Sequence, residues 1–410
     1  MVGANAVNPS SAGHNDGDGR PPGRADEVLL AFLKLGLTSF GGPVAHLGYF
    51  HNEFVIRRKW LDEPTYADIL ALCQFLPGPA SSQVGLTIGL VRAGWSGALA
   101  AWCGFTLPSA IVMVLFAYGV SAAGSLADSG WLHGLKIAAV SVVAVALLGM
   151  IRTLTPDRIR ATFAVVAAIL VIALPSAVGQ LVAIAAGALA GATLLRADAP
   201  AVSDDLKIPV RRRTGALLIA MFFVLLLGLP LLAAGSTSTD LRLFDTFYRV
   251  GSLVFGGGHV VLPLLQSELV PTGLIRNDAF LAGYGAAQAV PGPLFTFSAY
   301  VGTVIGGLTS AAICLAAIYL PSFLLIGGVL PFWQRLRRVT AMQAALRGVN
   351  AAVVGLLLAA FYNPVWTSAI HGSADFALAV GAFALLQAWR TPPWLVVLVC
   401  ALCGGLLGRF

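Results

Sequence analysis

Long apolar runs, separated by short polar loops, follow one another along the chain from residue 28 almost to its end. A helix needs about 20 mostly apolar residues to cross a bilayer, and most of these runs approach that length. We expect each run to be a helix, because a lone strand leaves its backbone groups unpaired in lipid. About thirteen such segments are predicted, at residues 28–50, 69–90, 97–120, 132–154, 160–175, 177–195, 215–234, 246–266, 280–304, 308–330, 343–362, 375–389 and 393–409.

The composition places the chain in a bilayer rather than in water. Hydrophobic residues make up 58% of it and charged residues 10%, whereas a soluble domain has roughly 45–50% and about 25%. So few charges cannot cover a water-facing surface, which excludes a soluble enzyme and a nucleic-acid-binding protein. The net charge of +7 comes from cations in the short loops. We predict an all-α polytopic membrane protein with a disordered cytosolic tail at residues 1–25.

Two pairs of sequence blocks repeat at a nearly constant offset. FLKLGLTSFGG, from residue 32, matches FYRVGSLVFGG 215 residues later, and QFLPGP, from residue 74, matches QAVPGP 214 residues later. We therefore expect two homologous halves, at 26–195 and 246–410. A cytosolic linker and a connecting transmembrane helix at 196–245 would join them. This one extra crossing would turn the second half upside down, which is the inverted repeat of many secondary transporters.

The distribution of arginine and lysine predicts the orientation. With a cytosolic N-terminus, most basic loops lie on the cytosolic side, as the positive-inside rule requires. The cluster at residues 57–59 fits only if the segments 28–50 and 69–90 are broken and re-enter on the cytosolic side. We therefore favour broken or re-entrant helices. The basic residues assigned to the cytosol are Arg152, Arg158, Arg160, Lys207, Arg211, Arg212, Arg213, Arg335, Arg337, Arg338 and Arg390.

Four segments are interrupted by glycine and proline, two in each half. Proline clashes with the preceding helical turn, and glycine tolerates sharp turns. In lipid such breaks occur only where they line a cavity or are buried in protein. A half-helix that begins at a break carries free N–H groups and a positive dipole end, which favour an anion. The break residues are Gly41, Gly42 and Pro43; Pro77, Gly78 and Pro79; Gly257 and Gly258; and Pro291, Gly292 and Pro293.

Polar side chains next to the breaks complete a candidate substrate-binding site. Compact donors flank the Pro-Gly-Pro breaks; the alternative is that hydroxyls bond only their own helix backbone. Two histidines follow the other breaks and would donate to an oxyanion or carry a proton. These residues are Gln74, Ser81, Ser82, Gln83, Gln288, Thr296, His46 and His259.

Lys34 and Arg249 occupy equivalent positions of the repeat, each inside an apolar run. A charge inside a membrane segment is costly and indicates function by default. Two symmetric cations would suit a divalent anion. The alternative is that both side chains extend to the membrane surface.

Two glutamates, Glu53 and Glu268, also recur in both halves. We expect them to form structural ion pairs with the nearby Arg57 and Arg276. His133 has no evident partner in the sequence, and we expect it to be satisfied within the helix bundle.

Sequence motifs for catalysis and cofactor binding are absent. There is no P-loop, no HExxH motif and no cluster with metal-ligand spacing. No nucleophile elbow or dinucleotide fingerprint stands in a suitable context. We therefore expect no enzyme activity, no cofactor and no metal site.

Three blocks, at residues 39–85, 254–270 and 286–302, resemble the signatures of the chromate ion transporter family. The resemblance implies an inner-membrane secondary transporter that exports chromate, driven by the membrane potential or a proton gradient, and confers chromate resistance. Its partners would be chromate, or sulfate of the same shape and charge, and the lipid bilayer. Transport of another anion, an anion channel and a membrane-bound reductase stay open as alternatives, as does a homodimer.

Overall fold

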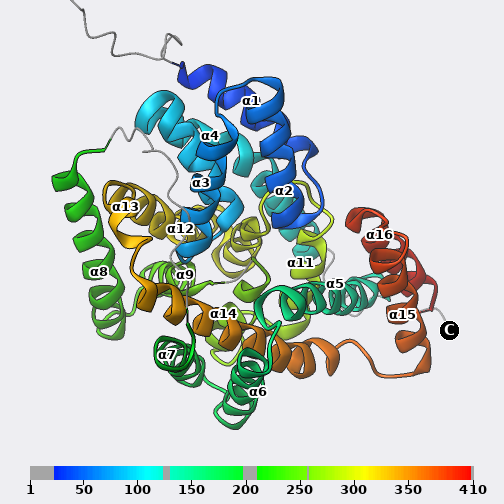
Figure 1. Ribbon diagram of the computed structural model, residues 1–410. Coiled ribbons are helices and arrows are strands. Elements are labelled where there is room, and N and C mark those ends of the chain that lie inside the picture. Colours follow the sequence, from blue (N-terminus) through cyan, green and yellow to red (C-terminus); the bar gives the residue numbers. More distant parts are fainter. Residues whose placement is uncertain (1–22, 123–129, 197–209, 256–257, 408–410) are drawn as a thin grey trace, which may run out of the picture.

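The computed structural model describes residues 23–122, 130–196, 210–255 and 258–407, and every regular element in these ranges is a helix (Figure 1). Residues 1–22 of the predicted tail and 197–209 of the predicted linker lie outside the described residues. The first half contains α1 Ala25–Thr38, α2 Gly42–Phe50, the π-helix η1 His51–Arg57, α3 Glu63–Phe75, α4 Ala80–Ala122, α5 Gly130–Leu154, α6 Arg158–Ala173 and α7 Ala177–Leu194.

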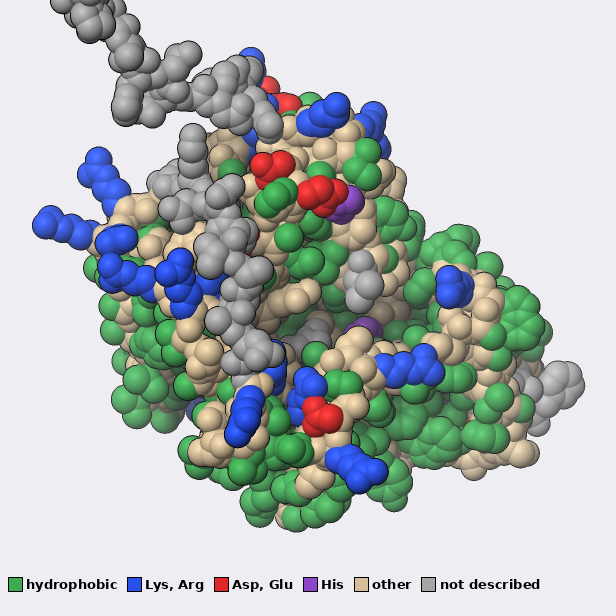
Figure 2. All heavy atoms as spheres, viewed as in Figure 1, with side chains coloured by type: hydrophobic (Ala, Val, Ile, Leu, Met, Phe, Trp, Pro, Cys, Tyr) green, Lys and Arg blue, Asp and Glu red, His purple; other side chains and the backbone are tan. Residues whose placement is uncertain are grey.

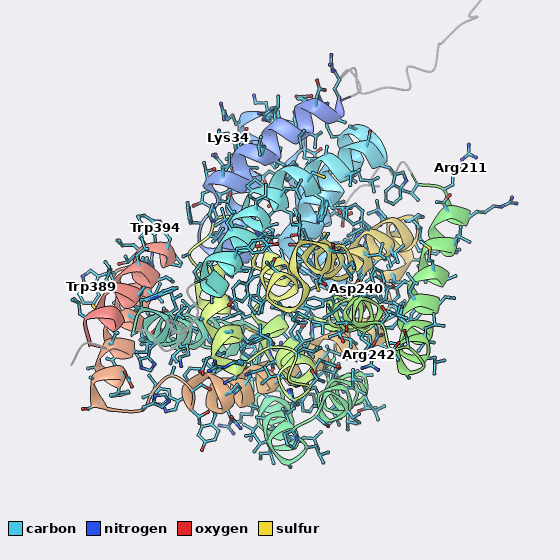
Figure 3. All side chains as sticks on the ribbon, turned by 180° about the vertical axis from the view of Figure 1, so that it is seen from behind. Lys34, Arg211, Asp240, Arg242, Trp389 and Trp394 are labelled. Atoms are coloured by element: carbon cyan, nitrogen blue, oxygen red, sulfur yellow. The ribbon has the colours of Figure 1, made fainter. Side chains whose placement is uncertain are left out.

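The long helix α8, Arg212–Ala234, leads into the second half. Figure 3 shows Arg211 at one end of α8, and Asp240 and Arg242 near its other end. The elements that follow are α9 Thr239–Leu253, η3 Gly258–Val260, α10 Val261–Leu269, α11 Asn277–Ala287, η4 Leu294–Thr296, α12 Phe297–Val329, η5 Leu330–Phe332, α13 Trp333–Leu336, α14 Thr340–Ala360, η6 Phe361–Trp366, α15 Ser373–Gln387 and α16 Pro393–Leu407.

The sequence repeat extends to the backbone. Helix α4 is interrupted at Ala93 and Gly94, whose φ angles are −143° and 64°. Helix α12 is interrupted at Gly306 and Gly307, whose φ angles are −149° and 74°. The two interruptions are 213 residues apart, so each half contains one long helix with the same bend in the same place.

The two halves are interlaced rather than side by side. Helix α1 packs on α4 and α9 packs on α12, and the two long helices contact each other. The later helices are exchanged: α5 packs on α15 and α16 of the second half, and α14 packs on α6 and α7 of the first (Figure 1). Glycines permit the close approach, as where Gly134 faces the backbone of Cys400 and Gly348 that of Gly187.

Among the residues that the structure describes, five helices are long and apolar enough to cross a membrane, and they lie at Ala80–Val120, Gly130–Leu154, Arg212–Ala234, Leu294–Leu336 and Thr340–Trp366. Three shorter apolar helices accompany them. Leu217, Val224 and Leu231 on α8 are 69%, 68% and 77% exposed, which suits contact with lipid. Figure 2 likewise shows hydrophobic side chains spread over much of one face of the molecule. The chain is therefore a multi-pass helical membrane protein.

Several predicted segments agree in position with helices of the structure. The predicted hairpin at 160–175 and 177–195 corresponds to α6 and α7, separated by a short turn. The segment predicted at 69–90 is divided between α3 and α4, because Pro77 and Pro79 separate two helices there. The total of about thirteen apolar helical segments stays a prediction.

Candidate functional site

A helix begins at or just after each of the four breaks. Helix α2 begins at Gly42, α4 at Ala80, η3 at Gly258 and η4 at Leu294. Before α2, Gly41 and Gly42 have φ angles of 101° and 75°, a left-handed backbone that favours glycine. Gly257, predicted as part of the third break, lies outside the described residues.

The breaks of the two halves meet through a reciprocal pair of hydrogen bonds. The amide of Gly78 in the first Pro-Gly-Pro donates to the carbonyl of Val254, at 2.7 Å. The amide of Gly292 in the second Pro-Gly-Pro donates to the carbonyl of Ser39, at 2.9 Å. Val254 and Ser39 are equivalent positions of the repeat. Each Pro-Gly-Pro break therefore pairs with the glycine-rich break of the other half.

A second reciprocal contact supports the first. A Cβ on Gly78 would lie 2.8 Å from Ser322 Oγ, and one on Gly292 would lie 2.9 Å from Ser109 Oγ. Both serines follow the proline inside a long helix, at equivalent positions. Gln83 Nε2 also donates to Ser322 Oγ, at 3.3 Å. The Leu-Pro-Ser repeat is the only sequence signal for this serine pair, and a site role for it does not follow from that repeat alone.

A cavity of about 400 Å³ lies where three of the four breaks meet; we call it the break cavity. One wall is formed by α5, from Val142 to Thr153. The break residues and polar side chains that line it are Gly41, Gly42, Pro43, Gly258, His259, Gln288 and Gly292.

At two of the breaks, no side chain caps the N-terminus of the helix that begins there. Elsewhere Asp62, Asp157 and Ser176 cap α3, α6 and α7, each accepting from a backbone amide, while α1, α8, α11 and α14 also begin without a side-chain cap. At the breaks, the N-terminal positions Gly41 and Pro293 supply no side-chain cap. The first N–H groups of a helix have no partner within it. These N-termini next to the break cavity can therefore donate to an anion.

The remaining predicted polar residues do not line the break cavity. His46 is buried between the carbonyl of Ser39, 3.2 Å from its Nε2, and Ser81 Oγ, 3.4 Å from its Nδ1. Thr296 donates to the carbonyl of Pro293, at 2.9 Å. Its hydroxyl therefore bonds the backbone of its own segment, which was the alternative to a role in substrate binding. Ser82 and Gln83 are buried at the start of α4.

Buried polar atoms near the breaks are left without a hydrogen-bond partner. They include Ser39 Oγ, Gln83 Oε1 and Ser298 Oγ. Most buried polar atoms in proteins are satisfied by protein, water or a bound group. Unsatisfied polar atoms beside the breaks therefore fit a site that takes a polar solute.

The two predicted cations are both paired with carboxylates, and neither lines the break cavity. Lys34 Nζ lies 3.7 Å from Glu53 Oε2. At the equivalent positions, Arg249 Nη1 lies 2.7 Å from Glu268 Oε1, and Arg249 also pairs with Asp245 at 3.0 Å. Figure 3 shows Lys34 on α1. The arrangement assigns both cations to ion pairs that brace α1 and α9.

The ion pairs of the glutamates correct one expectation and confirm another. Glu53 pairs with Arg57, at 3.1 Å, as predicted. Glu268 pairs with Arg249 instead of Arg276, because Arg249 projects from the neighbouring helix α9 and reaches it directly.

Glu53 also accepts from Arg58 at 2.7 Å. Burial opposes its ionisation, but the hydrogen bonds from Arg58 and Arg57 outweigh this and hold the pKa of Glu53 below its ordinary value. The pairing is therefore complete at neutral pH. Its contribution to stability is lost as the pH falls through that lowered pKa.

Arg249→Ala is expected to destabilise the protein far more than Lys34→Ala. Removing Arg249 leaves two mostly buried carboxylates without their cation, at a cost of about 2–3 kcal/mol. The Lys34 side chain is 53% exposed, and such pairs contribute less than about 1 kcal/mol. Thermal unfolding of the purified variants in detergent measures the difference. Equal melting temperatures would contradict the assignment of Arg249 as a brace.

A second cavity, of about 450 Å³, adjoins the first Pro-Gly-Pro break through Gln74 and Phe75. In its wall, Arg337 Nη1 lies 2.6 Å from Asp68 Oδ1, and both side chains are at most 5% exposed. This buried pair joins α3 of the first half to the end of α13 in the second. The sequence does not single it out, because the two residues are far apart in the chain and outside the repeated blocks.

Interlaced helical halves, broken helices that meet around a cavity, and apolar outer faces are features of a membrane transport protein. The profile of the chromate transporter family matches residues 27–192 and 241–405. The chain belongs to the chromate transporter family.

Curated relatives share this similarity over most of their length. The chain is 26% identical over 393 residues to a probable chromate transport protein of Synechococcus elongatus, covering 92% of this chain and 94% of that one. It is 27% identical over 411 residues to a chromate transport protein of Pseudomonas aeruginosa, covering 95% and 92%. A chromate transport protein of Cupriavidus metallidurans is 26% identical over 344 residues, covering 82% and 81%. No solved structure matches the chain.

Proposed function

We propose that this protein is a secondary transporter that exports chromate from the cytoplasm across the inner membrane and so confers chromate resistance. Chromate is a tetrahedral oxyanion that is largely divalent near neutral pH. The substrate would bind in the break cavity, where helix N-termini, Gln288 and His259 offer hydrogen-bond donors. The names of the relatives support chromate as the substrate.

The observation that carries this proposal is the reciprocal pairing of Gly78 with Val254 and of Gly292 with Ser39. It brings breaks from both halves to one place, next to a cavity. Secondary transporters bind their substrates where discontinuous helices of two repeats meet. A site built from both halves can change its access when one half moves against the other.

The two halves are proposed to be inverted in the membrane, with the N-terminus in the cytosol. Helix α8 supports the inversion, because no equivalent helix precedes α1 within the described part of the first half. One unpaired crossing between two equal halves reverses the orientation of the second half in the membrane. In the inverted arrangement, the helix N-termini at the breaks point toward the cavity from opposite sides of the membrane.

The membrane potential can drive export without ATP. Moving one charge across 100 mV is worth about 2.3 kcal/mol. A dianion leaving a cell that is negative inside would therefore gain about 4–5 kcal/mol per 100 mV, or roughly a thousandfold in concentration ratio. Coupling to protons, with His46 or Glu53 as carrier, is the alternative source of energy.

Radiolabelled chromate flux in proteoliposomes tests the proposal. Flux is expected without any nucleotide, and it should fail when an imposed potential is collapsed. Flux that persists after collapse but stops when a proton gradient is removed would replace the electrogenic mechanism by proton coupling. Sulfate competition at equal concentration would identify the broader substrate class, and flux that does not saturate would indicate a channel. No chromate flux under any gradient would overturn the proposal.

Gln288→Leu is expected to raise the KM for chromate about fivefold, because it removes a donor from the wall of the break cavity. Gln180→Leu is the matched control: Gln180 is a glutamine too, but it is buried and donates to the carbonyl of Pro263 away from this cavity. The control should keep the wild-type KM, whatever its effect on stability. An unchanged KM in Gln288→Leu would place the substrate elsewhere.

A further inference from the structure

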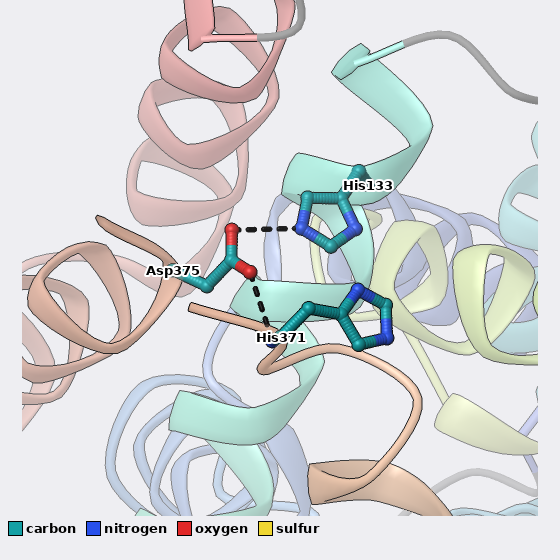
Figure 4. A group of neighbouring side chains, drawn as sticks. All are labelled: His133, His371 and Asp375. Atoms are coloured by element: carbon teal, nitrogen blue, oxygen red, sulfur yellow. Dashed lines mark hydrogen bonds and ion pairs between the residues drawn. The ribbon is translucent and has the colours of Figure 1, made fainter. Parts of the chain in front are cut away.

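Three side chains with metal-binding chemistry meet near the N-terminus of α5 (Figure 4). The break cavity is lined by the later part of the same helix. His133 comes from the first turns of α5, and His371 and Asp375 come from the start of α15 and the loop before it. Their ligand atoms all lie within 4.8 Å of one another. His133 and Asp375 belong to different halves and are 242 positions apart in the chain, so no sequence spacing indicates this group.

The ligand atoms of the group are already spaced almost as they would be around a bound metal ion. His133 Nε2 lies 2.8 Å from Asp375 Oδ1. The rings of His133 and His371 are stacked, with centroids 5.5 Å apart and planes 20° from parallel. Ligands of a tetrahedral zinc ion lie about 2.0–2.2 Å from the metal, so they are separated by about 3–3.5 Å. A shift of about 1 Å in the exposed His371 would bring the three ligand atoms to that spacing.

The carboxylate is held in place by its second oxygen. Asp375 Oδ2 accepts from the backbone amides of His371, at 2.9 Å, and Gly372, at 3.2 Å. These bonds orient Oδ1 toward His133, as outer hydrogen bonds orient the ligands of known metal sites. They also tie the loop that carries His371 to the helix that carries Asp375. The carboxylate is therefore positioned before any ion arrives.

We propose that His133, His371 and Asp375 form a binding site for a zinc-class divalent cation that fastens α5 to the second half. Two imidazoles and one carboxylate suit Zn²⁺, whereas Mg²⁺ and Ca²⁺ prefer oxygen ligands. With three protein ligands, a fourth coordination position is open to water. The neighbouring Asp278, which pairs with Lys136 at 2.9 Å, adds a carboxylate close to the group.

Zinc binding would act on the transport proposed above through α5, because the same helix forms one wall of the break cavity. A bound ion would resist any movement of α5 against α15. Zn²⁺ is therefore expected to slow chromate flux, an effect that rests on the proposed function. The binding itself does not rest on it and is measured separately.

Titration calorimetry of the full chain in detergent with Zn²⁺ alone tests the site. One ion per chain is expected, with affinity about tenfold or more weaker in His371→Ala and Asp375→Asn. His51→Ala is the matched control: His51 Nε2 also lies 2.8 Å from a carboxylate, that of Glu63, without a second imidazole. The control should bind as tightly as wild type, and Mg²⁺ should produce no heat at this site.

His371 is exposed in a loop, so His371→Ala is expected to fold and to keep its melting temperature without metal. Co²⁺ gives a second readout, because its visible absorbance reports coordination directly and should be lost in the same variant. Equal Zn²⁺ affinity in wild type and His371→Ala would overturn the proposal, and so would a Co²⁺ spectrum that the variant leaves unchanged. Neither outcome would bear on chromate transport.

Discussion

Gly78→Ala and Gly292→Ala are each expected to destabilise the protein by about 2–4 kcal/mol and to abolish transport. Both glycines have left-handed backbones, with φ angles of 123° and 97°, which cost other residues about 1–2 kcal/mol. An added Cβ would also push against Ser322 or Ser109 of the opposite half. The cross-half hydrogen bond, worth about 1 kcal/mol, would then be strained or lost.

Thermal unfolding in detergent and chromate flux in proteoliposomes measure these effects. The two variants should behave alike, because the contacts they disturb are equivalent. Gly228→Ala is the control: Gly228 lies within α8, with no neighbour within 4 Å of an added Cβ. Alanine there should be neutral or slightly stabilising. Wild-type stability and flux in Gly78→Ala would show that the breaks do not meet as described.

Arg337→Ala is expected to lower the stability by about 3–5 kcal/mol, because it removes the Arg337 guanidinium from the buried carboxylate of Asp68. The pair is 2.6 Å long, and the Nε1 of Trp333 also donates to Asp68, at 3.4 Å. Asp68→Ala should cost a similar amount. The double variant should cost less than the sum of the two, since no isolated charge remains in it.

Arg160→Ala provides the comparison with an exposed ion pair. Arg160 Nε lies 2.6 Å from Asp157 Oδ2, as close as the buried pair, but Asp157 is 45% exposed. The substitution keeps the cap that Asp157 forms with the backbone amide of residue 160. It should cost less than about 1 kcal/mol. Similar losses in Arg160→Ala and Arg337→Ala would contradict the role of the buried pair in joining the halves.

The existence and positions of most helices follow from the sequence for a simple reason. In lipid every backbone group must be paired within the segment, so an apolar run of sufficient length becomes a helix whatever its neighbours. The segments predicted at 215–234 and 343–362 accordingly correspond to α8 at Arg212–Ala234 and α14 at Thr340–Ala360. At the breaks the same reasoning is weaker, because proline and glycine interrupt the internal pairing.

The partners of the charged residues were the least predictable part of the site. Spacing along the chain suggested Arg276 as the partner of Glu268, but a side chain on the adjacent helix α9, Arg249, is nearer in space. His133 was expected to be satisfied within the bundle, and its partner Asp375 comes from the other half. Ion pairs depend on distances of a few ångströms, which the order of residues does not specify across separate helices.

By itself the sequence determined that this is an all-helical chain in a membrane, with a repeated pattern of broken segments, because backbone pairing in lipid and the geometry of proline and glycine act locally. Only the tertiary structure decided that each Pro-Gly-Pro break pairs with the glycine-rich break of the other half. It also decided that α5 and α14 are exchanged between the halves. Packing between apolar helices is not directional, so many pairings suit the same apolar pattern, and close contacts such as that of Gly134 with Cys400 select one of them.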